Sequence, residues 1–145
     1  MKIEYPVRIG KDEESGAFLV EGLEPLVNVL TYGNSLEEAL AHAQDALTGV
    51  LGSMLDNGDD IPDPVRSSRK EKNVYWIEPD PKVAIPILVK KTRLAAGMTL
   101  EELAGKAGVS YQQIQKWEKS GTNPTVSSLK KVFRAMGKRL DLDVA

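Results

Sequence analysis

Residues 108–121 read GVSYQQIQKWEKSG and combine amide and ammonium side chains with a regular apolar frame. Ile114 and Trp117 are three positions apart, a spacing that places both on one face of a helix. Glutamine amides pair with adenine in the DNA major groove, and lysines donate hydrogen bonds to guanine or to phosphate. A helix with such a polar and basic face fits the major groove. The alternative is a surface helix whose polar residues are only solvated.

Residue types that support catalysis or bind metals are few. The chain has no cysteine, which excludes disulfides, thiol catalysis and thiolate metal sites, and its single histidine, His42, leaves no nitrogen cluster for zinc or copper. Carboxylates are numerous, but many fall in or near the first turn, whereas acid-dependent nucleases hold metals with carboxylates fixed on strands. We therefore expect a protein that is not an enzyme and that has no metal site and no cofactor.

Charge is distributed unevenly along the 145 residues, a length with room for one ordinary domain or two small ones. Residues 1–80 hold 7 Lys plus Arg against 16 Asp plus Glu, giving −9, and residues 81–145 hold 12 against 5, giving +7, which together make the net −2. This asymmetry favours two domains with partners of opposite charge: a basic protein for the acidic half and nucleic acid for the basic half. The alternative is that the charges only solvate the surface.

The sequence also indicates a compartment. No apolar run approaches the roughly 20 residues that are needed to span a bilayer. The first residues, MKIEYPVRIGKDEESG, lack the positively charged and apolar regions of a signal peptide. We therefore expect a cytoplasmic protein without a membrane partner.

The first half of the chain shows the alternation that is typical of strands. Apolar residues recur at every second position in 2–9, the period of a half-buried strand. After a polar turn, residues 17–23 are predicted to return as the second strand of a hairpin. Further strands are expected at 26–32 and 73–79. Together they predict a small sheet.

A long amphipathic helix is expected between the third and fourth strands. Ser35 and Glu38 form a capping box at its start, and apolar residues recur at helical spacing until Asn57 and Gly58. Residues 59–73 follow and are rich in proline, serine and charge, which predicts a connector. The first half is therefore expected to be a sheet with one helix on one face.

The second half changes to short helices. Asp80 and Pro81 could open a helix as N-cap and first residue, but Pro86 cannot donate a backbone hydrogen bond and would break or kink its first turns. The first regular helix is therefore expected over 86–96. Capping boxes at 99–102 and 110–113 start the next two helices, and a fourth is expected over 126–136. Apolar residues alternate with charged ones in 139–144, which predicts a terminal strand with one apolar face.

These elements predict an α+β protein of two domains whose activities separate at the connector. The N-terminal domain, residues 1–80, is a small β-sheet with one long helix. The C-terminal domain, residues 81–145, is helical and ends in a strand. Since the helical domain has no sheet to receive that strand, we expect a homodimer in which residues 138–144 pair with their two-fold copy.

Residues 93–137 resemble the phage-repressor, or Xre-type, helix-turn-helix family. The matching features are Leu103-Ala104, Gly108-Val109-Ser110, Ile114, Glu118, Gly121, Pro124 and Leu129. The resemblance implies that Tyr111, Gln112 and Lys116 read bases. It also implies that Ser110 and Gln113 cap the helix or touch phosphate, with Lys119 and Asn123 as further DNA-binding candidates. In such repressors the position of Glu118 pairs with an arginine of the first helix. Arg93 stands at the matching place, so this pair is expected to brace the fold.

Residues 1 to about 80 resemble the HicB antitoxin domain in the order YPVRI, FLVEGL, LTYGNSLEEALAHAQDAL and IPDP, although EPLVNV replaces the usual glycine-containing turn. The resemblance implies a degraded ribonuclease H-like fold and an antitoxin that blocks a HicA-like mRNA-cleaving toxin and represses its own operon at an inverted repeat. The candidate toxin-binding residues are Asp12, Glu13, Glu14, Glu21 and Glu24. The alternative function is a transcription regulator whose N-terminal domain senses a ligand or dimerises.

Overall fold

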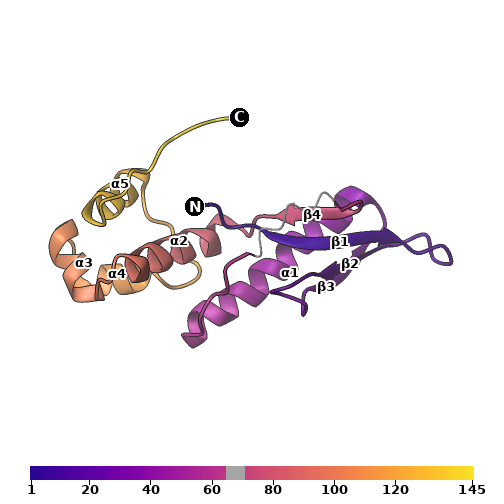
Figure 1. Cartoon of the computed structure of the whole chain (residues 1–145), viewed down its shortest axis with the longest axis horizontal. Helices are drawn as coiled ribbons and strands as arrows, with labels where there is room; N and C mark the ends of the chain where they lie inside the picture. Colours follow the sequence, from indigo (N-terminus) through magenta and orange to yellow (C-terminus); the bar gives the residue numbers. More distant parts are fainter. Residues whose placement is uncertain (65–70) are drawn as a thin grey trace.

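The structure is a computed structural model that describes residues 1–64 and 71–145. It is elongated, with the sheet and its helix at one end and the short helices at the other (Figure 1). The elements in chain order are β1 (Tyr5–Lys11), β2 (Phe18–Gly22), β3 (Leu30–Gly33), α1 (Leu36–Asn57), β4 (Val74–Ile77), α2 (Pro81–Ala95), α3 (Leu100–Ala107), α4 (Tyr111–Trp117) and α5 (Val126–Ala135). The expected α+β class is confirmed, and no helix of the described ranges is long and apolar enough to cross a membrane.

The four strands form one antiparallel sheet in the order β3-β2-β1-β4. On β1, the alternation predicted from the sequence turns Tyr5, Val7 and Ile9 toward α1, and all three are buried. Val20 of β2 joins them in the same hydrophobic cluster. Two of the expected strands, β1 and β2, therefore form a hairpin as predicted, and β4 forms within the stretch predicted for it.

α1 covers one face of the sheet and has the predicted ends. The Ser35 hydroxyl accepts a hydrogen bond from the Glu38 backbone N–H at 3.1 Å, and Gly58 adopts a left-handed conformation after the last turn. Leu47 and Leu51 are completely buried against the strands. Burial of a leucine side chain stabilises a fold by about 1.5–3 kcal/mol, so this face of α1 holds the sheet in place.

The third strand was expected over 26–32 but begins only at Leu30. The preceding residues turn instead of extending, which buries Leu26 and Val29 in the core. The Gly22 backbone N–H donates to the Val29 carbonyl at 2.6 Å, and a Cβ at Gly22 would clash with the Leu26 carbonyl oxygen. Glycine at position 22 therefore lets the Leu26 carbonyl pack against the end of β2. An alternating apolar pattern alone does not reveal this contact.

α2 was expected to begin at Pro86, and this prediction was wrong. The helix begins at Pro81, with the Asp80 carboxylate accepting from the Lys82 backbone N–H at 2.9 Å. Pro86 lies within the helix and leaves the Lys82 carbonyl without its usual donor four residues later. The Gly121 backbone N–H donates to that carbonyl at 3.0 Å. A loop distant in sequence thus supplies the hydrogen bond that the proline removes.

The three remaining helices follow the predicted pattern. Thr99 and Glu102 form the complete capping box of α3, and Gly108 ends α3 in a left-handed conformation. The buried faces of α3, α4 and α5 meet in a second hydrophobic cluster that includes Leu103, Ile114 and Val132. This cluster is separate from that of the sheet.

Helix α2 contributes to both clusters. Val83 and Ile87 belong to the cluster of the sheet, whereas Val89 belongs to the cluster of the short helices. The two regions are also joined near the end of α1, where the Asp56 carboxylate accepts from the Ser120 backbone N–H at 3.1 Å and from its hydroxyl. A domain boundary after residue 80 remains our proposal for the division of functions.

The predicted connector at 59–73 includes residues 65–70, which lie outside the described residues. Its described N-terminal part is fastened to the rest of the molecule. The Tyr5 hydroxyl donates to the Pro62 carbonyl at 2.7 Å, and burial followed by the charge of Asp63 raises the pKa of Tyr5 to about 12. The Lys91 ammonium donates to the Ile61 carbonyl and to Asp63, both at 2.6 Å. This part of the connector therefore has fixed contacts.

The predicted terminal strand at 139–144 is not formed in the single chain. Leu140 still packs against the cluster of the short helices, and the last residues of the chain extend away from the helices as a tail (Figure 1). Leu142 is 68% exposed and Val144 is 95% exposed. A strand is defined by hydrogen bonds to a neighbouring strand, and no described strand of the chain pairs with residues 138–145.

Candidate nucleic-acid interface

Two buried side chains set the orientation of α4. The Ser110 hydroxyl accepts a hydrogen bond from the Gln113 backbone N–H at 3.1 Å and caps the start of the helix. Ile114 is fully buried and Trp117 is 7% exposed, and both pack in the cluster of the short helices. Trp117 is therefore a core residue, as predicted, and the opposite face of α4 is turned to solvent.

The solvent face of α4 carries the candidate DNA-binding residues. Gln112 and Lys116 are exposed and four positions apart, so they are neighbours on the helix surface. Lys119 lies three positions further on, just beyond the helix, and is also exposed. Of the other candidates, Ser110, Tyr111 and Asn123 are exposed and Gln113 is half-buried. The exposed row has amide donors and acceptors and two cations, the groups that contact base edges and phosphates.

Gln115 belongs to the same surface but was not among the candidates from the sequence. It is exposed and three positions from Gln112, which places it beside Lys116 on the helix. The spacing signal was present, since residues i, i+3, i+4 and i+7 share a face. The register taken from the repressor family pointed to Tyr111, Gln112 and Lys116 and passed over Gln115. We add Gln115 to the proposed interface.

A buried ion pair holds the end of α4. Arg93 donates through Nε to Glu118 Oε2 at 2.6 Å and through Nη2 to Glu118 Oε1 at 2.9 Å, and its Nη1 donates to the Met98 carbonyl at 2.8 Å. The two charged residues are 9% and 8% exposed. The pair that the repressor resemblance implied is therefore formed, and it links α2, the turn before α3 and the C-cap of α4.

This pair is buried and positions the helix. Glu118 is enclosed, and both of its carboxylate oxygens accept hydrogen bonds from Arg93. Removal of one partner from a buried ion pair leaves an uncompensated charge, which destabilises a protein by about 3–5 kcal/mol. The orientation of α4 therefore depends on Arg93 as well as on the apolar contacts of Ile114 and Trp117.

Of the five acidic candidates for toxin binding, Glu21 lies on the sheet and Glu24 lies in the turn that follows it. Glu21, on β2, forms an ion pair with Arg8 of β1 at 3.2 Å. Glu24 follows β2 and lines the same hollow as Glu21. Arg8 also pairs with Glu71 at 3.2 Å, so it lies between two carboxylates. The structure therefore brings Glu21 and Glu24 together on one side of the molecule.

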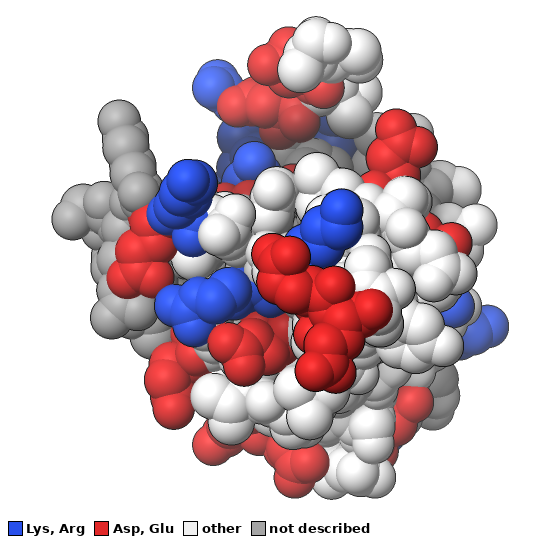
Figure 2. Space-filling view, turned by 90° about the vertical axis from the view of Figure 1, so that its right-hand side faces the viewer, with Lys and Arg blue, Asp and Glu red and all other residues white. Residues whose placement is uncertain are grey.

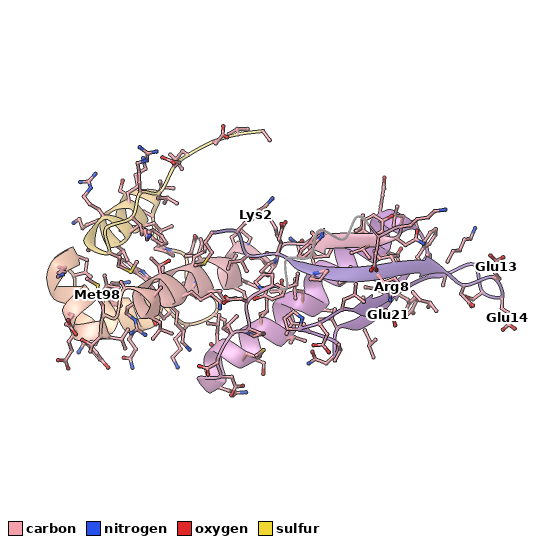
Figure 3. All side chains as sticks on the ribbon, viewed as in Figure 1. Lys2, Arg8, Glu13, Glu14, Glu21 and Met98 are labelled. Atoms are coloured by element: carbon pink, nitrogen blue, oxygen red, sulfur yellow. The ribbon has the colours of Figure 1, made fainter. Side chains whose placement is uncertain are left out.

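The other three acidic candidates lie in the hairpin that joins β1 to β2. The Asp12 carboxylate accepts from the Ser15 hydroxyl at 2.6 Å and from its backbone N–H at 3.1 Å, and these hydrogen bonds lower the pKa of Asp12. Glu13 and Glu14 project from the tip, away from Glu21 (Figure 3). Seen toward this end, carboxylates form several groups separated by cations and uncharged surface (Figure 2). The acidic half therefore presents no single acidic patch on this side.

His42, the only histidine, is held by its helix and a strand. Its Nδ1 lies 2.6 Å from the Tyr32 carbonyl oxygen. Within residues 1–64 and 71–145, no group of three or more His, Asp and Glu is arranged to hold a metal ion. His42 thus has a structural contact between α1 and β3.

The family described as HicB_like antitoxin of bacterial toxin-antitoxin system matches residues 4–90, which is more than half of the chain. The chain belongs to this HicB-like antitoxin family. A second family, described as Helix-turn-helix, matches residues 89–142 of the HicB-like chain and includes α3, α4 and α5. Both resemblances seen in the sequence are therefore confirmed, and α4 is the second helix of a helix-turn-helix unit.

Relatives of this HicB-like chain are similar over nearly their whole length. The protein named Antitoxin HicB 2 of Photorhabdus laumondii is 29% identical over 138 residues, covering 95% of this chain and 94% of the relative. Antitoxin HicB of Escherichia coli K12 is 27% identical over 138 residues, covering 95% and 96%. The crystal structure of the Burkholderia pseudomallei antitoxin HicB is similar at 14% identity and a TM-score of 0.46, covering 74% of this chain and 94% of that chain.

Proposed function

We propose that this chain blocks a small basic HicA-like mRNA-cleaving toxin and represses transcription of its own operon. The observation that carries the proposal is the union of a HicB-like region, residues 4–90, with a helix-turn-helix region, residues 89–142. Full-length relatives are named antitoxins. The chain acts by occupying surfaces of its partners and has no catalysis of its own. An mRNA-cleaving partner and operator DNA both imply that it works in the cytoplasm.

Toxin binding is assigned to the N-terminal domain, residues 1–80. This region carries −9 at neutral pH by the count of its charged residues, 7 basic against 16 acidic. A field of that sign accelerates the encounter with a basic protein and is weakened by salt. Occlusion of the toxin's active site then neutralises it without a chemical step.

Operator binding is assigned to the C-terminal domain, residues 81–145, which carries +7 from 12 basic and 5 acidic residues. α4 enters the major groove with Tyr111, Gln112 and Lys116 toward the base edges, while Lys119 and Asn123 contact the phosphate backbone. A homodimer formed through this domain presents two such helices. Its operator is then an inverted repeat whose half-site centres are about 34 Å apart, or a multiple of that distance.

The experiment that tests the proposal combines growth and DNA binding. The full-length chain is co-expressed with the product of the adjacent open reading frame, a basic protein of roughly 60 residues by the family expectation, and growth is scored. The same preparation is tested by mobility shift on the DNA upstream of the pair. We expect rescue of growth, co-purification of the basic protein and a specific shift.

A control variant separates the two assigned activities. Gln112→Ala combined with Lys116→Ala is expected to lose the specific shift and to retain rescue of growth, because both residues lie on exposed α4. A chain that shifted the operator but brought down no basic protein would be a transcription regulator, and the toxin assignment would fail.

A further inference from the structure

The face of the sheet opposite α1 is apolar and exposed. Strand residues alternate between faces, so the side that does not pack on α1 carries Leu19 of β2 and Leu30 and Tyr32 of β3. These side chains are 52%, 70% and 58% exposed. Val27, in the turn before β3, is 56% exposed. No described helix covers this side, which we name the outer sheet face.

Strand register makes the outer sheet face continuous. Leu19 lies opposite Tyr32, and Glu21 lies opposite Leu30 and, on its other side, opposite Arg8. β4 extends the same rows, with Val74 opposite Arg8 and Trp76 opposite Pro6. Apolar side chains therefore flank a central Arg8–Glu21 ion pair. Residues directly opposite across strands are in contact, so the face is one surface and not a scatter of separate side chains.

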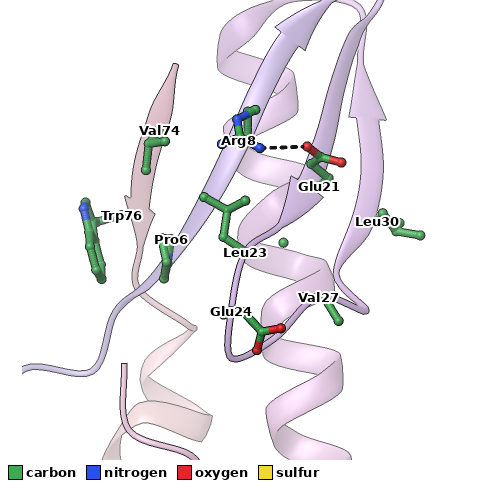
Figure 4. A pocket seen from close by; sticks show the side chains of 10 residues that line it. Pro6, Arg8, Glu21, Leu23, Glu24, Val27, Leu30, Val74 and Trp76 are labelled. Atoms are coloured by element: carbon green, nitrogen blue, oxygen red, sulfur yellow. Dashed lines mark hydrogen bonds and ion pairs between the residues drawn. The ribbon is translucent and has the colours of Figure 1, made fainter. Parts of the chain in front are cut away.

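A hollow in this face has the size to receive a side chain of a partner. Its volume is about 470 Å³. Trp76 and Val74 lie on one side of it and Leu30 and Val27 on the other, with Leu23 and the Arg8–Glu21 pair between them (Figure 4). Interface anchors are characteristically large side chains that fill pockets of this kind, surrounded by contacts that exclude water.

The charges on the outer sheet face favour a basic partner. The charged residues that line its hollows or pair within it are Arg8, Lys11, Asp12, Glu21, Glu24 and Glu71, two cations against four carboxylates. They belong to a region of charge −9, from 7 basic and 16 acidic residues. A second copy of the same face would bring like charges together, which is unfavourable. A basic protein would complement them.

We propose that the outer sheet face is the docking surface for the basic toxin, with Leu30 and Tyr32 as apolar anchors and Glu21 and Glu24 as the acidic rim. This inference rests on the proposed function. It moves the centre of toxin recognition away from Glu13 and Glu14 at the hairpin tip and onto the strands. Apolar anchors then provide most of the affinity, and the carboxylates provide orientation and association rate.

The test compares two exposed leucines in the full-length chain. Leu30→Arg places a charge in the outer sheet face, and Leu94→Arg places the same charge on α2, where Leu94 is 54% exposed. The probe is the purified product of the adjacent open reading frame, titrated by calorimetry. Leu30→Arg is expected to weaken binding about 10- to 30-fold, the effect of losing an interface anchor, and Leu94→Arg to leave it within about twofold.

A second variant separates loss of apolar contact from added charge. Tyr32→Ala removes the apolar anchor without changing charge and is expected to weaken toxin binding as well. Leu30 and Tyr32 are both exposed on an edge strand. The operator shift and the thermal transition of both variants should therefore match those of the wild-type chain. If Leu30→Arg and Tyr32→Ala bound the toxin like wild type, the proposed face would be wrong while the antitoxin function stood.

Two further outcomes would also overturn the assignment. If the wild-type chain bound no basic protein, the proposed function itself would fail. If Leu30→Arg kept full toxin affinity but lowered the mass measured by light scattering, the outer sheet face would be a contact between copies of this chain.

Discussion

At the scale of single residues, Gln112 offers the sharpest test of DNA reading. Its side chain is exposed on α4, next to Lys116. Gln112→Ala should lower affinity for the operator by about 1–3 kcal/mol, because a bidentate contact to a base is lost. Fluorescence anisotropy on operator and random DNA measures the change. Asn28→Ala, which removes an exposed amide in the loop before β3, is the matched control and should have no effect. Equal losses on both DNAs would show that Gln112 does not read a base.

Asp56 allows a test of the contact between α1 and the loop after α4. Hydrogen bonds from the Ser120 hydroxyl and backbone N–H lower the pKa of Asp56. A carboxyl whose pKa is lower in the folded state stabilises that state above its unfolded pKa and loses this effect as pH falls through its folded pKa. The contact should therefore weaken in acid below the ordinary range of aspartate.

Carboxyl resonances followed by NMR through an acid titration would check this. Ser120→Ala should raise the pKa of Asp56 toward its ordinary value, since the largest cause of the shift is removed. Asp12 is an internal control, because its pKa is lowered by Ser15 at the far hairpin and should not move. A pKa of Asp56 that stayed unchanged in Ser120→Ala would mean that the hydrogen bond is not formed in solution.

Residue patterns predicted the exposed row of α4 because Ile114 and Trp117 fix the orientation of the helix by themselves. They also located the partner of Glu118 through the family resemblance. The sequence did not predict the Asp56–Ser120 contact. Its two residues are 64 positions apart, and neither belongs to a motif that would mark it as a contact. Contacts of this kind depend on how two elements pack, which local spacing does not contain.

At the scale of elements, the C-terminal tail should determine the assembly. Leu142 and Val144 are exposed on a segment that has no neighbouring strand in the described chain. Pairing of residues 138–144 with their two-fold copy would satisfy the backbone and cover the apolar side chains. Deletion of residues 138–145 is expected to convert dimers into monomers, measured by light scattering coupled to chromatography. A dimer that persisted after the deletion would refute this mode of association.

Two elements show why sequence periodicity falls short. Alternation in 139–144 predicts a strand, yet a strand exists only with a partner, and the sequence does not say which chain provides it. Pro86 predicts a helix boundary, yet α2 continues through it because the Gly121 N–H takes over the Lys82 carbonyl. In both cases the local sequence pattern correctly indicated backbone groups that lack a local hydrogen-bond partner. Whether an element forms there depends on a partner that is distant in sequence or lies on another chain.

At the scale of the whole molecule, α2 connects the two functional regions more closely than the sequence suggested. Val83 and Ile87 are 1% and 0% exposed in the cluster of the sheet, although they follow the proposed boundary at residue 80. A fragment of residues 1–90 should therefore be more stable than a fragment of residues 1–80, by about 1.5–3 kcal/mol for each buried side chain.

Thermal unfolding followed by circular dichroism compares the two fragments. The variant Val83→Ser and Ile87→Ser in the longer fragment is the control, because it keeps the added length and removes the apolar contacts. It should unfold like the shorter fragment. If residues 1–80 unfolded at the same temperature as residues 1–90, the first half of α2 would not belong to the core of the sheet.

The Gly121 N–H donates to the Lys82 carbonyl, which Pro86 leaves without its usual helical donor. This amide can therefore report how often the loop after α4 separates from α2. An amide proton exchanges with solvent only when its hydrogen bond breaks. This one joins the loop after α4 to the first turns of α2, at 3.0 Å. Its exchange rate measures how often that loop separates from α2. Slower exchange in the presence of operator DNA, or faster exchange in the presence of the toxin, would record at one atom whether the two proposed partners of this chain influence each other.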